Sequence, residues 1–227
     1  KMQELLEQWI PNVMDKLPEF GQAIIDTIVM TLWSGVIAFI AGMILGIILT
    51  VTKNGGILEN RAVVQVLDKL INIFRSVPFI ILLTALLPLT RFVTGTAIGV
   101  KGAILPLVFG VVPFFTRQVE SALAEVDTGL IEAAESIGYS PLEIIYRVYL
   151  REGIPALARV TTITLINLIG LTAMAGVVGA GGLGDFAIRY GHNRFQTDVT
   201  AVTVVVLILM VCIIQMAGSM IAKKNTH

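Results

Sequence analysis

The side chains that could carry covalent or metal chemistry are few in this sequence and lie far apart. The chain has two histidines, His192 and His227, and one cysteine, Cys212, which lies inside an apolar run. We expect this cysteine to be a small hydrophobe facing lipid or a neighbouring helix. No His-Glu-x2-His or Gly-x-Ser-x-Gly segment occurs, so no pattern indicates a bound metal or an activated nucleophile. We therefore expect no catalytic residue, no metal-binding residue and no enzyme.

A glycine-rich segment suggests phosphate binding. Gly179-x-Gly181-x-x-Gly184 has the spacing of a dinucleotide fingerprint, but it follows an apolar stretch long enough to span a membrane instead of a strand. A Gly-x4-Gly-Lys-Ser/Thr phosphate loop is also missing. We therefore expect these glycines to unwind the outer end of a membrane helix. We expect no cofactor in this chain, so that any ATP and Mg²⁺ would be bound by a separate protein.

The acidic segment at about 127–153 carries the remaining candidate, a docking element. Asp127 or Thr128 can cap the N-terminus of a short helix. Gly138 lies where a glycine in the left-handed conformation would end that helix. The next residues, Ser140-Pro141-Leu142-Glu143, form a capping box with proline at the first helical position, which predicts the start of a second helix. The segment is therefore expected to fold as a helix, a tight turn and a helix.

Three interpretations of this segment are open. A DNA-binding helix-turn-helix shares the spacing from Ala134 to Gly138, but the acidic side chains along the segment would be repelled by phosphates, so we expect no nucleic-acid partner. A packed structural loop is the second interpretation. The third, which we favour, is docking to a cytoplasmic partner, because Ala133 and Ala134 permit close approach and Glu132 offers a charge-assisted contact.

The apolar stretches that position this segment predict an all-α integral membrane protein. Of the 227 residues, 56% are hydrophobic and 14% are charged, whereas soluble domains have roughly 25% charged residues. Three stretches of 24 to 26 residues carry no charge; as helices they would be roughly 36–39 Å long, enough to cross a hydrocarbon core of about 30 Å. Two shorter uncharged stretches must extend past a charge to cross. We expect five spans, at about 23–52, 63–89, 102–124, 156–180 and 198–222.

The second expected span has a polar stripe. Its members recur every three or four residues and are Gln65, Asp68, Lys69, Asn72, Arg75 and Ser76. Such a stripe must face protein or a water-filled cavity. Arg75 and Ser76 are therefore candidates for lining or gating a pathway, together with Pro78, Met174 and Gly179. Helix kinking at the proline and core packing of Met174 are the structural alternatives.

Charge and amphipathicity predict how the chain lies in the membrane. Residues at about 3–20 have apolar side chains at helical spacing and predict an interfacial helix; a frayed polar terminus is the alternative. Nine basic residues flank the connections on one side of the spans and six those on the other. The positive-inside bias places the C-terminus and segment 127–153 in the cytoplasm and the N-terminus outside.

The acidic segment also carries a family resemblance. Glu132-Ala133-Ala134-x3-Gly138, followed by Val148-x-Leu150, resembles the EAA loop of bacterial ABC importer permeases, in which this loop is the coupling helix seated on the ATPase. The resemblance implies a single permease domain, residues 1–227, with the type I importer permease fold. The coupling residues that it implies are Glu132, Ala133, Ala134, Ile137 and Gly138. The family pattern ends in Leu-Pro, whereas this chain has Leu150-Arg151 at that place. This replacement affects how the second helix ends.

Other segments narrow the resemblance. Asn72–Leu83 is similar to the second span of methionine importer permeases, and Thr128–Ala133 and Gly179–Gly184 resemble the same subfamily. The resemblance implies import of methionine, in its L- and D-forms, by alternating access. Another amino acid or small polar solute is the alternative within the family, and an ATPase-independent channel or carrier is the alternative outside it.

The resemblance also implies partners and a location. The expected partners are a second copy of the chain, two ATP-binding cassette ATPase subunits, an extracytoplasmic lipoprotein that binds the substrate, and membrane lipid. The expected location is the bacterial cytoplasmic membrane, crossed several times.

Overall fold

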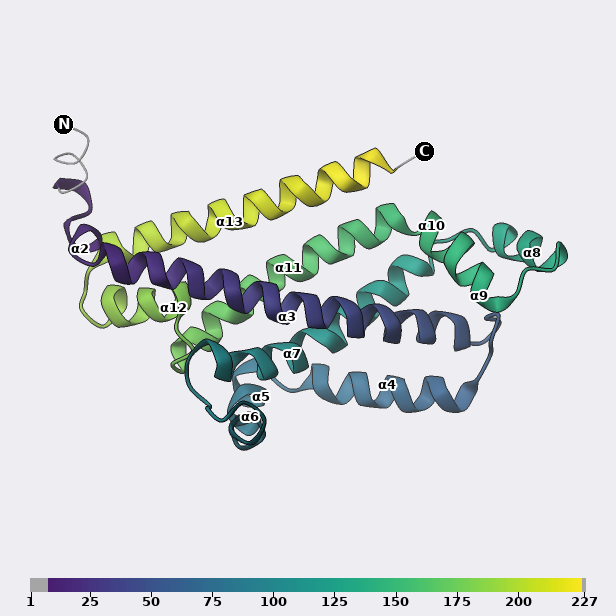
Figure 1. The fold of residues 1–227 in the computed structure, drawn as a ribbon, viewed down its shortest axis with the longest axis horizontal. Coiled ribbons are helices and arrows are strands. Elements are labelled where there is room, and N and C mark those ends of the chain that lie inside the picture. Colours follow the sequence, from purple (N-terminus) through teal and green to yellow (C-terminus); the bar gives the residue numbers. More distant parts are fainter. Residues whose placement is uncertain (1–7, 226–227) are drawn as a thin grey trace. The chain divides into compact units, whose positions relative to one another are not determined.

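Residues 8–225, which the computed structural model describes, form helices joined by short turns, with no strand among them (Figure 1). This confirms the expected all-α class. The residues group into two compact units. Unit 1 comprises the chain up to Gly35 with Pro78–Val108 and Leu165–Ile214, and unit 2 comprises Val36–Val77, Phe109–Thr164 and the chain from Gln215.

Four helices in the described part of the chain are long and apolar enough to cross a membrane. They are α3 (Leu17–Thr52), α7 (Gly99–Leu123), α11 (Ile154–Val177) and α13 (Thr197–Lys224). These helices correspond to four of the five expected spans. Each of them contributes residues to both units.

The expected second span at 63–89 is not one continuous helix. It is divided into α4 (Arg61–Ser76), α5 (Phe79–Ala85) and α6 (Leu87–Thr94). The first break occurs because Val77 precedes a proline and is extended, with φ −85° and ψ 123°; the proline ring disfavours helical backbone at the residue before it. At the next junction Pro88 lies in the first turn of α6, where proline is tolerated.

In unit 2, α3 and α7 approach closely at two glycines. A Cβ atom on Gly42 would lie 2.7 Å from Cδ1 of Phe115, and one on Gly46 would lie 2.5 Å from Cγ1 of Val119. Both distances are below ordinary van der Waals contact, so only glycine allows this spacing of the two helices. Small residues four apart commonly permit such close packing of membrane helices.

Unit 1 has its own core, which joins the start of α3 to two later segments. The buried residues are Val13, Phe20, Ala23, Leu183, Phe186 and Val199. Figure 1 shows α2 (Pro11–Met14), α12 (Gly182–Phe186) and the first turns of α13 near one another. Asn12 donates from its backbone and its side chain to Asp198, at 3.0 Å in each case, and the backbone N–H of Leu183 donates to Oγ1 of Thr27 at 2.8 Å.

The interfacial helix expected at about 3–20 is only partly tested. Its first residues lie outside the described part of the chain. The remainder is two elements, because α2 ends at Met14 and α3 begins at Leu17. An uninterrupted helix through residue 20 is therefore wrong.

The contact at Gly46 leads to a stability prediction. Gly46→Ala should lower the midpoint of thermal denaturation in detergent, because overpacking costs about 1 kcal/mol or more, or roughly 2–4 °C in a chain of this size. Gly21→Ala is the control, since it lies in the same helix and its Cβ would meet nothing within 4 Å. The midpoint is measured by size-exclusion chromatography after heating, and equal midpoints for the two variants would contradict the close packing.

Candidate functional site

Helix α8 (Thr128–Ser136) has defined hydrogen bonds at both ends. Its N-cap is Asp127, whose Oδ1 accepts from the backbone N–H of Gly129 at 2.8 Å. At the other end Gly138 adopts φ +85°. The N–H of Gly138 donates to the carbonyl of Glu135 at 3.0 Å, and that of Tyr139 donates to the carbonyl of Ala134 at 3.1 Å. These two bonds form a Schellman motif, which confirms both caps expected from the sequence.

The second helix of the segment begins at the expected capping box. The backbone N–H of Glu143 donates to Oγ of Ser140 at 3.4 Å, and that of Ser140 donates to Oε2 of Glu143 at 3.0 Å. The hydrogen bonds that Oε2 of Glu143 accepts, first from the Ser140 backbone N–H and then from the Ser140 hydroxyl, lower the pKa of Glu143, so the carboxylate stays an ionised acceptor at neutral pH. The helix continues as α9 (Pro141–Ile144), the π-helical η1 (Ile145–Tyr149) and α10 (Leu150–Glu152).

The segment packs into the same core as the ends of three long helices of unit 2. The buried residues of this core come from α3 (Val51), α7 (Phe115, Val119, Ala122 and Leu123), the turn before α8 (Val126), the segment itself (Ala134, Ile144, Val148 and Tyr149) and α11 (Ala156 and Leu157). Burial raises the pKa of the Tyr149 hydroxyl, and the negative charge of Glu135 raises it further. Because side chains in such a core are close-packed, a displacement of α8 must move the helix ends against which it packs.

The five coupling residues expected from the sequence do not all face the same way. Glu132, Ala133 and Gly138 are exposed, and the Ile137 side chain is 70% exposed. Ala134 is only 5% exposed and belongs to the core. The expectation that Ala134 meets a partner directly is therefore wrong, because a helix face that packs inward cannot also be the docking face. Its small side chain lets α8 approach the other helices.

Three apolar side chains extend the exposed face of this segment, and the sequence interpretation missed them. Leu130 is exposed, Leu142 is 77% exposed and Tyr146 is 75% exposed. Their amphipathic spacing with the buried Ile144 and Val148 could have identified them. We call the exposed residues Leu130, Glu132, Ala133, Ile137, Leu142 and Tyr146 the docking face. A set of apolar side chains on helical turns outside the spans is typical of a surface that binds another protein.

A polar cluster on α4 and α7 was also missed. Arg117 donates to Oδ1 of Asp68 at 2.6 Å, to Oε2 of Glu120 at 2.7 Å and to Oδ1 of Asn72 at 3.4 Å. This confirms that Asp68 and Asn72, two members of the expected polar stripe, face protein. The pairing offsets the cost of placing a guanidinium group in a membrane helix, and it ties α4 to α7 within unit 2.

The five pathway candidates are divided between the two units. Arg75 and Ser76 end α4 in unit 2, where both are exposed and Oγ of Ser76 donates to the carbonyl of Ile73 at 2.8 Å. Pro78, Met174 and Gly179 belong to unit 1, in which Met174 is 41% exposed. Gly179 has φ +90°, and its carbonyl accepts from the N–H of Gly99 at 3.0 Å. Helix α11, which corresponds to the fourth expected span, therefore ends in a glycine turn, as expected.

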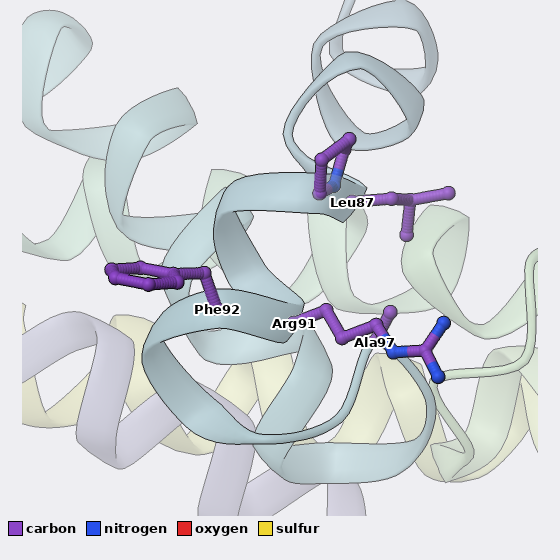
Figure 2. Close-up of a pocket in the computed structure, with 5 residues that line it drawn as sticks. Leu87, Arg91, Phe92 and Ala97 are labelled. Carbon is purple, nitrogen blue, oxygen red and sulfur yellow. The ribbon is translucent and has the colours of Figure 1, made fainter.

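An open pocket with a volume of about 610 Å³ lies at α6 in unit 1. Its lining residues are Leu87, Pro88, Arg91, Phe92 and Ala97. Figure 2 shows Arg91 and Phe92 projecting from the helix in different directions. Arg91 could pair with a carboxylate, but the lining side chains include no acid that could pair with an ammonium group. The pocket therefore lacks half of the partners that a zwitterionic amino acid requires.

Comparison with known proteins gives consistent matches over most of the chain. Residues 39–222 match the family described as binding-protein-dependent transport system inner membrane component. A Vibrio cholerae protein named "Probable D-methionine transport system permease protein MetI" is 48% identical over 202 residues, which are 89% of this chain and 90% of the relative. A Pasteurella multocida protein of the same name is 44% identical over 207 residues, 91% and 95% of the two chains.

Solved structures agree with these sequence matches. A chain of the MetNI methionine ABC transporter, in an inward-facing conformation, superposes with a TM-score of 0.91 at 41% identity, covering 94% of this chain and 99% of that one. A chain of an amino acid ABC transporter superposes with a TM-score of 0.77 at 17% identity, and this second likeness concerns the fold alone.

Proposed function

The chain belongs to the family of binding-protein-dependent transport system inner membrane components, and we propose that it is the membrane-spanning permease subunit of an ATP-driven methionine importer. ATP hydrolysis resides in a partner ATPase, and this chain is the transport subunit. The observation that carries the proposal is the docking face. It presents apolar side chains outward while the same helix, through Ala134, packs against the ends of α3, α7 and α11.

We propose that coupling to ATP hydrolysis uses this geometry. When two ATPase subunits close on ATP, the α8 segment moves with the groove that holds it, and the long helices rock from an inward-open to an outward-open state. The ATPase must bind one permease state more tightly than the other, because equal affinity for both states shifts no population. Arg75, Ser76, Pro78, Met174 and Gly179 are proposed to line or gate the pathway that alternates.

The proposed assembly contains two copies of this chain. ABC-family ATPases close as a pair around two ATP molecules, and one chain offers one docking face, so a symmetric permease homodimer with two ATPases is the simplest arrangement. An extracytoplasmic lipoprotein would deliver the substrate. The solved MetNI transporter, to which this chain is similar, and the family description support this set of partners.

The proposed location is the bacterial cytoplasmic membrane with the docking face inside. We infer that α4 and α5 together form the second crossing, because the 16 residues of α4 span only about 24 Å. Five crossings place the N-terminus outside and the C-terminus in the cytoplasm. The excess of basic residues on the same side as α8 supports this orientation.

The proposed substrate is methionine in its L- and D-forms, as the names of the two relatives and the solved transporter indicate. Another amino acid or small polar solute is the alternative. The pocket at α6 lacks an ammonium partner, so selectivity for an amino acid is proposed to reside mainly in the external binding protein.

An uptake experiment tests the substrate. Proteoliposomes containing this chain, its ATPase and its external binding protein should accumulate radiolabelled L-methionine only with internal MgATP, and unlabelled D-methionine should compete. Failure of methionine to accumulate, with uptake of another amino acid in its place, would favour the alternative substrate. Methionine entry that does not require ATP would indicate a channel or carrier.

A glycine pair tests the coupling. Gly138→Val should lower both ATPase retention by the tagged permease and uptake by about tenfold, because a left-handed backbone costs about 1–2 kcal/mol in an L-residue. The matched control is Gly55→Val. Gly55 also has a positive φ, +74°, with nothing within 4 Å of an added Cβ, and it lies in another loop of unit 2. Equal losses in the two variants would show that general strain, and not docking, explains the effect.

A further inference from the structure

Three basic side chains of unit 1 gather around one aromatic ring. Nζ of Lys16 lies 5.5 Å from the ring centroid of Tyr190, Cζ of Arg189 lies 5.1 Å from it and Cζ of Arg194 lies 4.9 Å from it. We call Lys16, Arg189, Arg194 and Tyr190 the Tyr190 cluster. The ring is held in place by Phe186, whose centroid is 5.0 Å away and whose side chain belongs to the core of unit 1.

The cluster has more positive than negative charge. Its cationic centres share one ring and so lie at most about 11 Å apart, close to the Debye length of about 8 Å at physiological salt, and they repel one another. Asp185 is the one acid in the described chain that forms an ion pair with the cluster, through Arg189. Asp198 accepts two hydrogen bonds from Asn12 and keeps its negative charge. Lys16 and Arg194 have no ion pair with any residue in the range 8–225. Attraction to the ring does not neutralise their charge, so the cluster attracts an anion.

An exposed aromatic side chain adjoins the cluster on a strained backbone. Phe195 has φ +57°, the one positive φ of a non-glycine residue in the described chain, and its side chain is 89% exposed. This conformation is unfavourable for a bulky L-residue. It persists because the N–H of Phe195 donates to the carbonyl of His192 at 3.2 Å and that of Gln196 donates to the carbonyl of Gly191 at 2.9 Å. The bonds follow the π-helical η2 (Ala187–His192).

The surroundings place this cluster at a membrane surface. Helix α13 begins at Thr197, two residues after Phe195, and only 11% of its most apolar stretch is buried within the chain. Trp9, 77% exposed, precedes α2, which is tied to the start of α13 through Asn12 and Asp198. Exposed aromatic and basic side chains at the end of a spanning helix are typical of the headgroup layer.

We propose that the Tyr190 cluster binds the phosphate of an anionic phospholipid, and that Trp9 and Phe195 lie in the adjoining acyl layer. The positive charge supplies the attraction to the headgroup, and the two aromatic side chains account for a lipid in preference to a free anion. The inference rests on the proposed function only in requiring that α13 spans the membrane; it does not depend on the substrate or on coupling to an ATPase.

Fluorescence quenching tests this proposal without any transport measurement. The chain has two tryptophans, so Trp33→Phe leaves as the only reporter Trp9, which precedes the α2 that is tied to the start of α13. In vesicles, brominated phosphatidylglycerol should bind next to Trp9 roughly three- to tenfold more strongly than brominated phosphatidylcholine, the preference expected for one or two lysines or arginines at a lipid surface. Adding Lys16→Gln and Arg194→Gln should reduce this ratio to about one.

The controls separate charge at this site from charge elsewhere. Arg91→Gln removes one cation from another part of unit 1 and should leave the ratio unchanged. Salt at about 1 M should abolish the preference in the Trp33→Phe parent by screening, which tests the proposal even where the double variant does not fold. A parent ratio near one, or a ratio unchanged in the folded double variant, would overturn the proposal. An unchanged ratio together with weaker capture of an acidic binding protein would also overturn the proposal, because this surface would then be a protein-docking site.

Discussion

The packing of helix α8 against the core of unit 2 is the constraint on which the proposed coupling depends, because the residues that α8 leaves exposed are the ones proposed to meet an outside partner. Ala134 satisfies the inner contact, since it is buried with residues from the ends of α3, α7 and α11. A larger side chain there would push α8 away from these helices, and a polar one would place an unpaired group in the core. Because α8 packs against the ends of these helices, we propose that a movement imposed on the docking face acts on them.

The hydrogen bonds at the ends of α8 and α9 fix the conformation of the turn that joins them, which supports the proposed coupling. The Schellman motif at Gly138 and the capping box from Ser140 to Glu143 follow each other directly, so the turn between the helices has few backbone groups left without a partner. The Arg117 cluster adds a second link, between α4 and α7. A flexible loop would absorb the displacement locally, whereas this segment moves with its neighbours.

The local sequence predicted where the helices lie better than it predicted which side of each helix is buried. Uncharged stretches located four long helices, and the residues Asp127, Gly138 and Ser140 predicted the caps, because these features depend on a few neighbouring residues. The rule that a residue before proline avoids helical backbone could also have predicted the break at Val77. The apolar content of 63–89 suggested one span instead. The inward side of Ala134 and the pairing of Asp68 with Arg117 depend on residues far apart in the sequence, which periodicity alone does not bring together.

Site-directed crosslinking tests the central claim, that α8 meets the ATPase with one face and the permease core with the other. In a Cys212→Ser background, Ala133→Cys and Ala134→Cys lie at adjacent positions, of which Ala133 is exposed and Ala134 is buried. With a photoreactive maleimide in membranes containing both subunits, Ala133→Cys should crosslink to the ATPase, and Ala134→Cys should remain unlabelled until the protein is denatured. Equal crosslinking at both positions, or labelling of Ala133→Cys by an impermeant reagent from outside the cell, would contradict the account.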